Sequence, residues 1–138
     1  MIFDALGELN WLAVLVATVA WFIWSAIWYS IPPISKPWQR AVGIEPSQSG
    51  TPLPTILVAT AVLYFITTVV IALLVEATGA QDAADGIALG VALGVGFGAV
   101  SSLISQLYEQ KGSAYWVING INAVVAWSIV AVVLTLMD

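Results

Sequence analysis

The chain has 138 residues, of which 61% are hydrophobic and only 8% carry a charge. Soluble proteins average about 25% charged residues, so this composition excludes a disordered chain, a nucleic-acid-binding protein and an ordinary soluble enzyme. It indicates a single integral-membrane domain that covers residues 1–138.

The residue types that are missing limit the reactions and binding sites that the protein can support. The sequence contains no Cys and no His, which removes disulfides, thiol nucleophiles and imidazole acid–base catalysis. Zinc sites usually need His or Cys, so we expect no metal site and no enzymatic activity. The net charge is −5, and the three cations, Lys36, Arg40 and Lys111, are too few for a nucleic-acid surface or a polybasic lipid-binding cluster.

Four apolar stretches are long enough to cross a bilayer, which takes about 20 residues in an α-helix. They cover approximately residues 9–29, 54–75, 86–108 and 114–137, and none of them contains Asp, Glu, Lys or Arg. The sequence therefore predicts an all-α fold, a four-helix transmembrane bundle.

The cations predict the orientation of this bundle. Lys36 and Arg40 lie between the first two spans, and Lys111 lies between the last two, so both loops face the same side of the membrane. Because Lys and Arg concentrate in cytoplasmic loops, we expect these loops in the cytoplasm and both termini outside. The expected location is the cell (inner) membrane.

The first loop is the only long one, and it contains all six prolines, between residues 32 and 54. Within it, the sequence PWQRAVGI predicts one short interfacial helix with Pro37 at its first position. Trp38, Ala41 and Val42 would then face the bilayer.

Small residues recur every four positions along the third span. They are Gly86, Gly90, Gly94, Gly98 and Ser102. Residues at i and i+4 share a helix face, and small residues let helix backbones approach closely in a membrane. This glycine face predicts that the third span is the central, tightly packed helix. The alternatives are a homo-oligomer interface and the lining of a solute path.

Four aromatic residues within the spans are candidates for a ligand-binding surface. They are Trp21, Trp24, Tyr64 and Trp127. Either they pack against lipid and neighbouring helices, or they form a surface for a flat hydrophobic ligand such as a quinone, a carotenoid or a sterol. No particular cofactor is implied, although a bound lipid fits this surface.

Polar residues gather toward the cytoplasmic side of the spans, within roughly 12 Å of that interface at a helical rise of about 1.5 Å per residue. The set comprises Ser25, Thr60, Ser101, Ser105, Gln106, Asn119 and Asn122. Because buried amides need hydrogen-bond partners, we expect Asn119 and Asn122 to point inward. The set forms either interhelical hydrogen bonds or a small vestibule open to the cytoplasm.

The segments WYSIPPISKPWQRAVG and LYEQKG resemble an uncharacterised bacterial membrane family, domain of unknown function 1761. The residues that fit the family pattern are Trp28, Tyr29, Ser30, Lys36, Trp38, Arg40 and Gly43 in the first segment and Glu109 and Lys111 in the second. Asn119 falls where members often carry Asn or Asp, whereas the apolar Ala123 replaces a polar residue. The resemblance covers nearly the whole chain and implies a four-span bacterial membrane protein without an assigned activity.

Three functions remain open at this point. The favoured hypothesis is a structural or accessory component that packs with itself, as a homo-oligomer, or with a larger membrane complex, because packing signals are strong and chemical motifs are absent. The alternatives are an oligomeric small-solute or ion transporter, and a protein that binds a hydrophobic cofactor, a pigment or a lipid. The expected partners are membrane lipids and membrane proteins, and not nucleic acid.

Overall fold

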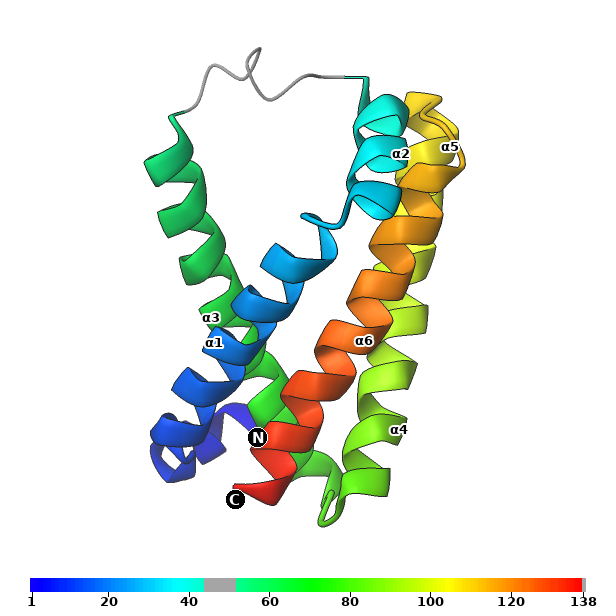
Figure 1. The fold of residues 1–138 in the computed structure, drawn as a ribbon. Coiled ribbons are helices and arrows are strands. Elements are labelled where there is room, and N and C mark those ends of the chain that lie inside the picture. The colour runs from blue at the N-terminus through cyan, green and yellow to red at the C-terminus, as the bar shows by residue number, and fades with distance from the viewer. Residues whose placement is uncertain (44–51, 138) are drawn as a thin grey trace.

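In a computed structural model of the chain, residues 1–43 and 52–137 are described, and they form helices and no strands (Figure 1). The elements are η1 Ile2–Glu8, α1 Trp11–Trp28, α2 Pro32–Val42, α3 Leu53–Thr78, α4 Ala83–Leu93, η3 Gly94–Ala99, α5 Val100–Glu109 and α6 Ala114–Leu136. Residues 44–51 of the long loop lie outside the described residues, as does residue 138.

The predicted all-helical fold with four spans is confirmed. The helices α1 and α3, the continuous run α4–η3–α5 and the helix α6 are each long and apolar enough to cross a membrane. Their ends fall within three residues of the limits predicted from the sequence.

Polar side chains fix the helix ends at one end of the bundle. Asn10 caps α1, because its side-chain oxygen accepts a hydrogen bond from the Ala13 amide at 3.2 Å. The Asn10 amide nitrogen also donates to the Met137 carbonyl oxygen at 2.7 Å, which ties the start of α1 to the end of α6. Asp82 caps α4 by accepting from the Asp85 amide at 2.8 Å.

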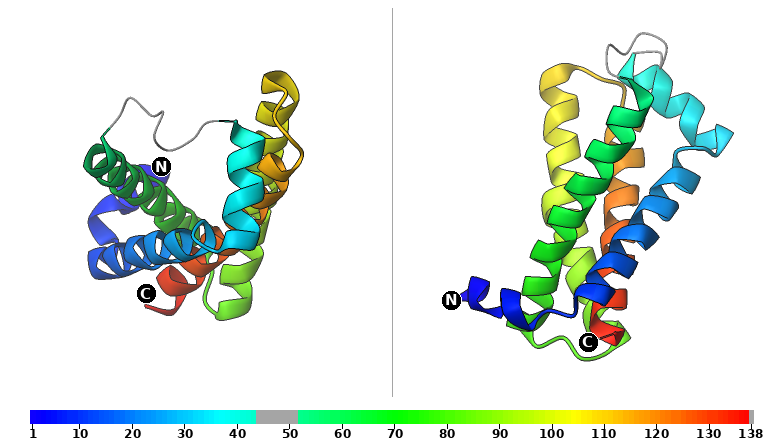
Figure 2. Two further views of the ribbon diagram at one scale, coloured as in Figure 1. Left: turned by 45° about the horizontal axis from the view of Figure 1, so that its top comes forward. Right: turned by 90° about the vertical axis from the view of Figure 1, so that its left-hand side faces the viewer.

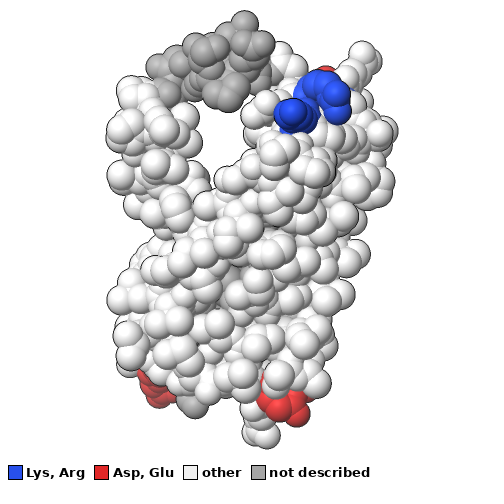
Figure 3. Space-filling model, in the orientation of Figure 1, with Lys and Arg blue, Asp and Glu red and all other residues white. Residues whose placement is uncertain are grey.

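The charged residues separate toward the two ends of the bundle, as Figure 3 shows. The end formed by α2 and the α5–α6 hairpin carries Lys36, Arg40 and Lys111, and we call it the basic end. The opposite end, which we call the acidic end, carries Asp82 and Asp85 at the start of α4. The side of the membrane that each end faces stays a prediction.

The central helix is α6, which contacts α1, α2, α3 and each part of the third span. The third span packs mainly on α6, and it has the smallest buried share of the four spans. The prediction that the third span is central is therefore wrong. Its small residues permit a close approach to one neighbour, whereas α6 buries residues on several of its faces.

The first part of the glycine face lies against the backbone of α6 in the same chain. A Cβ atom added at Gly90 would lie less than 3.0 Å from the Ser128 Cα, and one at Gly94 equally close to the Val124 Cα. Side chains larger than hydrogen therefore do not fit at these two positions without moving α6. Because α6 already covers this face, an interface between copies of the chain would have to use another surface.

The register of this contact shifts by one residue at the π-helical segment η3. The facing pairs are Gly86 with Val132, Gly90 with Ser128, Gly94 with Val124 and Ala99 with Gly120. The steps along α6 are four residues throughout, but the last step on the third span is five, because the wider π turn takes up one extra residue. Gly98 instead lies beside the Ala123 side chain, so the four-residue series predicted through Ser102 does not run along one contact line.

The apolar core lies toward the acidic end, where α1, α3 and α6 meet. Its buried members are Leu9, Ala13, Val14, Ala17, Trp21, Ile71, Ala72, Leu73, Val75, Ala126, Val130, Ala131 and Leu134. All buried residues of α3 fall between Thr68 and Val75. The first half of this helix therefore has few packing contacts with the rest of the described chain. Figure 1 and the left view of Figure 2 show the first half of α3 standing apart from α2.

The helix α2 differs from its prediction in two ways. It begins at Pro32, five residues before the predicted start at Pro37, which lies inside the helix. Two successive prolines suit the first helical turn, because their missing amides have no intrahelical acceptor there. Trp38 does not face the bilayer as predicted, because its indole nitrogen donates to the Asn119 side chain of α6 at 3.1 Å.

Replacing Gly90 by Ala should destabilise the bundle, because the added methyl group overlaps the α6 backbone. Overpacking of this kind costs about 1–3 kcal/mol, and a lower melting temperature in detergent solution measures the loss. The matched control is Gly96→Ala on the same span, since nothing lies within 4 Å of a Cβ atom there. Equal melting temperatures for the two variants would contradict the close helix approach.

Candidate functional site

A cleft of about 590 Å³ opens between α1, α2 and the first half of α3. Its lining residues are Phe22, Ser25, Ala26, Tyr29, Trp38, Leu53, Ile56, Leu57, Thr60 and Tyr64. Figure 3 shows this opening near the basic end of the molecule. The cleft exists because α2 occupies the side of α6 at this end, which leaves residues 53–59 at the start of α3 exposed.

Aromatic rings form one wall of the cleft and its support. The Tyr64 ring stacks on the Trp21 ring, with 3.9 Å between centroids and 6° between planes. Trp127 of α6 meets Trp21 edge-on at 6.2 Å, and Phe22 meets Tyr64 edge-on at 6.1 Å. Two of the four predicted aromatic residues, Trp21 and Trp127, thus lie behind Tyr64, which lines the cleft.

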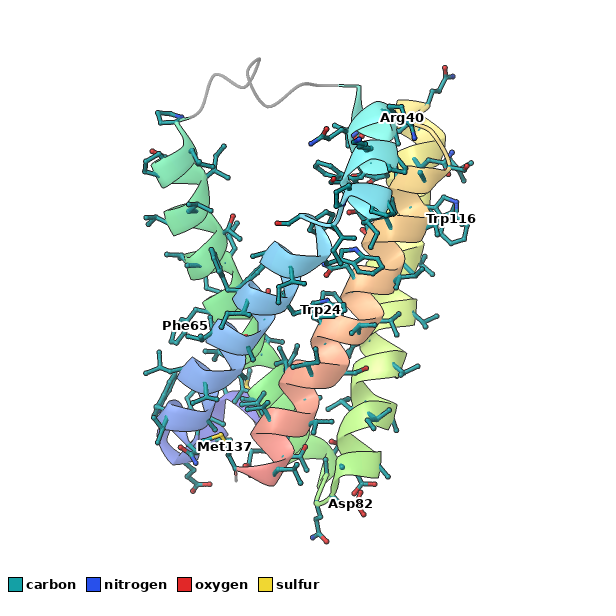
Figure 4. The ribbon with its side chains drawn as sticks, in the orientation of Figure 1. Trp24, Arg40, Phe65, Asp82, Trp116 and Met137 are labelled. Carbon is teal, nitrogen blue, oxygen red and sulfur yellow. The ribbon has the colours of Figure 1, made fainter. Side chains whose placement is uncertain are left out.

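The fourth predicted aromatic residue, Trp24, lies apart from this stack. It lies between α1 and α6 in Figure 4 and stacks on Trp28, with 5.7 Å between ring centroids. The Trp28 indole nitrogen donates to the Ile118 carbonyl oxygen of α6 at 3.2 Å. This pair therefore joins α1 to α6 outside the cleft.

A hydrogen-bonded group joins α1, α2 and α6 at the basic end of the cleft. The Asn119 side-chain oxygen accepts from the Tyr29 hydroxyl and from the Trp38 indole nitrogen. The rings of Tyr29 and Trp38 also meet edge-on, with 5.3 Å between their centroids. One amide oxygen on α6 thereby fixes the end of α1 and the middle of α2.

Several buried polar atoms beside this group have no hydrogen-bond partner among the described residues. The Ser25 hydroxyl and the Asn122 side-chain oxygen are the two that belong to polar side chains, which are 7% and 9% exposed. The others are the indole nitrogens of Trp21, Trp24 and Trp127. A buried polar atom without a partner costs about 1–3 kcal/mol, so a partner from outside the chain would be favoured. Of these residues, Ser25 lines the cleft.

The structure divides the predicted polar set into two groups. Ser25 on α1 and Thr60 on α3 line the cleft, and the Thr60 hydroxyl donates to the Ile56 carbonyl oxygen. Asn119 and Asn122 lie on α6 outside the cleft lining, one helical turn apart. Ser101, Ser105 and Gln106 lie on the third span. Within the described part of the chain, no hydrogen bond joins these third-span residues to either asparagine.

The predicted motif residues also separate into two places. Tyr29 and Trp38 enter the cleft lining, whereas Glu109 and Lys111 form an ion pair at 2.6 Å in the α5–α6 hairpin. The Glu109 carboxylate raises the pKa of the half-buried Lys111 amine above its ordinary value by accepting its hydrogen bond. Lys111 also lies 4.4 Å from the centre of the Tyr115 ring.

The other motif residues are local to the α1–α2 connection. Ser30 donates to the Ala26 carbonyl oxygen, and Gly43 ends α2 with a φ of +76°, a conformation that favours glycine. Lys36 and Arg40 are exposed on α2, and neither forms an ion pair with a described residue. Figure 4 shows Arg40 on α2 at the basic end of the bundle.

A second apolar groove of about 400 Å³ lies between the third span and α6. It is lined by Ala99, Trp116, Val117, Gly120, Ile121, Val124 and Val125. Unlike the cleft, its lining contains no hydroxyl or amide side chain. Among the described residues, no group of three or more His, Cys, Asp or Glu side chains is placed to hold a metal ion.

The fold has the features of a helical membrane protein, with four helices that are long and apolar enough to span a bilayer. More particularly, the chain belongs to the family described as protein of unknown function (DUF1761), whose model matches residues 12–135. This match confirms the family suggested by the sequence motifs. No curated protein and no solved structure matches the chain.

Sequence reasoning alone did not find the cleft. Tyr29 and Trp38 stood out only as motif residues, and nothing in the spacing linked either of them to Asn119. The available signal was that Ser25 and Tyr29 lie four residues apart on one face of the first span, with polar groups at both positions. No such signal in the sequence predicts that the first half of α3 stands apart from α2, because this half is as apolar as the second half.

Asn119→Leu should destabilise the protein more than Tyr29→Phe does. The Leu variant leaves the Tyr29 and Trp38 donors without their acceptor, at about 1–3 kcal/mol for each unsatisfied group. The Phe variant removes one donor and keeps the Trp38 bond. Melting temperatures in detergent measure the difference, and equal losses for the two variants would contradict the shared acceptor.

Proposed function

We propose that the protein binds an amphipathic, lipid-soluble molecule in the cleft between α1 and α3. The observation that carries this proposal is an apolar cleft of about 590 Å³ whose lining includes the buried hydroxyl of Ser25, which has no hydrogen-bond partner among the described residues. Small-molecule sites are typically apolar clefts of about 300–1,000 Å³ with a few polar groups that orient the ligand. This cleft has that size and that composition.

The two walls of the cleft differ in how closely they are packed, which suits reversible entry from the bilayer. The α1 and α2 walls are held to α6 by the Asn119 hydrogen bonds. The α3 wall begins with residues 53–59, which are exposed, and the buried residues of this helix begin only at Thr68. A ligand entering between α1 and α3 therefore needs to displace lipid and not a packed core.

Native mass spectrometry of the protein extracted gently from its own membrane tests this proposal. We expect a bound species in the wild type, and a roughly tenfold lower occupancy in Leu57→Trp, because the larger ring fills the cleft. The matched control is Leu63→Trp on the same helix, where the side chain is 61% exposed and lies outside the cleft lining. Equal occupancy in both variants would contradict a ligand in the cleft.

A second candidate function is that of an accessory component of a homo-oligomer or a larger membrane complex. It is favoured by the third span, which α6 covers on one side while Val91, Val95 and Phe97 stay exposed, the last at 68%. The apolar groove beside Trp116 adjoins this surface. Lipid or another membrane protein would cover such a face.

The mass of the intact complex distinguishes this second candidate function from ligand binding by a monomer. We expect a defined mass above that of the protomer after gentle extraction. Phe97→Ala should lose this complex and keep its melting temperature, because the Phe97 side chain is 68% exposed in the protomer. A monomer under all gentle extraction conditions would exclude the accessory role. Transport is less favoured, because the predicted vestibule residues on the third span do not hydrogen-bond with the asparagines of α6.

A further inference from the structure

We propose that the ligand of the α1–α3 cleft is an uncharged lipid with a linear hydrocarbon chain and a head group that carries hydroxyls. The head group would lie between Ser25 and Thr60, and the chain would follow a hollow that continues from the cleft. This inference rests on the proposed function and names the chemical class of its ligand. The charge of the lining, the positions of its hydroxyls and the course of its apolar part support it.

The lining of the cleft is uncharged. Among the described residues that form it, none is Asp, Glu, Lys or Arg. Lys36 and Arg40 of α2 lie outside this lining, and Lys111 is paired with Glu109 in the α5–α6 hairpin. A charge that leaves water for apolar surroundings without a counter-charge costs far more than an uncharged polar group. The part of a ligand that lies inside the cleft is therefore uncharged.

Two hydroxyl side chains lie at a similar depth on opposite walls of the cleft. Ser25 and Thr60 line it from α1 and α3, which run in opposite directions (Figure 1). The stacked rings of Trp21 and Tyr64 set the level at which these two helices meet. Ser25 and Thr60 each lie one helical turn from that pair, toward the basic end. A head group at this level can therefore reach a hydroxyl on each wall.

The hydrogen-bonding capacity of these two side chains matches a hydroxyl on the ligand. The Thr60 hydroxyl donates to the Ile56 carbonyl oxygen at 2.7 Å, so its oxygen is left as an acceptor. Ser25 is 7% exposed, and its hydroxyl has no partner among the described residues, so it can donate as well as accept. Ligand hydroxyls can donate to Thr60 and accept from Ser25, whereas an ionised carboxylate or phosphate can only accept.

An apolar path for the chain continues from the cleft toward the middle of the spans. A hollow of about 320 Å³ shares Phe22 and Leu57 with the cleft and extends to Thr18 and Val19 on α1. The Thr18 hydroxyl already donates to the Val14 carbonyl oxygen at 2.8 Å. From the level of the two cleft hydroxyls to Thr18, the path runs roughly 10 Å along α1. A linear hydrocarbon chain suits such a path.

Retention of matched oleoyl esters by the delipidated protein tests the inference. The probes share one oleoyl chain and are esters of glycerol, of glycerol with both free hydroxyls methylated, of glycerol phosphate and of choline. After incubation and gel filtration, mass spectrometry of the organic extract gives the moles retained per mole of protein. We expect the glycerol ester to be retained about tenfold more than the methylated ester, which cannot donate to Thr60. The anionic and cationic esters should be retained no better than the methylated one.

Substitutions of the two hydroxyl residues give different signatures. Thr60→Val should abolish the preference for the glycerol ester over the methylated ester, because it removes the acceptor for the ligand hydroxyl. Ser25→Ala should lower the retention of both uncharged esters and keep that preference, because it removes the donor on the other wall. The matched control is Thr78→Val, at the other end of α3, where the hydroxyl likewise donates to a backbone carbonyl oxygen one turn earlier. It should change neither quantity.

Each outcome separates this inference from the proposed function. Wild-type retention of the methylated ester or of a charged ester equal to that of the glycerol ester overturns the hydroxyl-bearing head group, as does a preference that survives in Thr60→Val. Cholesterol retained above the glycerol ester overturns the linear chain. In these cases the cleft remains a binding site if Leu57→Trp expels whichever probe is retained. If Leu57→Trp lowers the retention of no probe while it melts as the wild type does, both proposals fail.

Discussion

The close approach of the third span to α6 is the contact on which the bundle depends. Gly90 and Gly94 let the α4 backbone approach the Cα atoms of Ser128 and Val124 more closely than any side chain would allow. In a bilayer, such close contact supplies the dispersion energy that the hydrophobic effect supplies in water. The third span thereby occupies one side of α6, and the remaining helices must share the other sides.

The cleft results from the way in which α1, α2 and α3 share the remaining sides of α6. Toward the acidic end, α1 and α3 both reach α6 and form the core with it. At the basic end, α2 takes this position and is fixed there by the bond between Trp38 and Asn119. Residues 53–59 at the start of α3 are then left exposed, and a cleft with polar groups on its inner wall opens beside them. The candidate site is thus a consequence of inserting a short helix between two spans.

The sequence predicted the spans well because their signal is local. About 20 apolar residues without charge define a transmembrane helix whatever its neighbours are, and the ends of α6 were predicted to within one residue. The neighbours of each helix depend on long-range geometry that periodicity does not contain. The glycine series therefore identified a packing face, but neither that α6 would be the central helix nor that the π turn would move the register to Ala99. Asn119 stood out by polarity, whereas its partners Tyr29 and Trp38 required the fold.

Photochemical crosslinking from inside the cleft tests the central claim most directly. A leucine analogue that carries a diazirine, incorporated at position 57 by codon suppression, reports what lies beside Leu57 in the native membrane. The account predicts a covalent adduct with the mass of one membrane lipid species, strongly enriched over the same probe at position 63, which lies outside the cleft lining. The same mixture of bulk lipid adducts at both positions would contradict a binding site in the cleft.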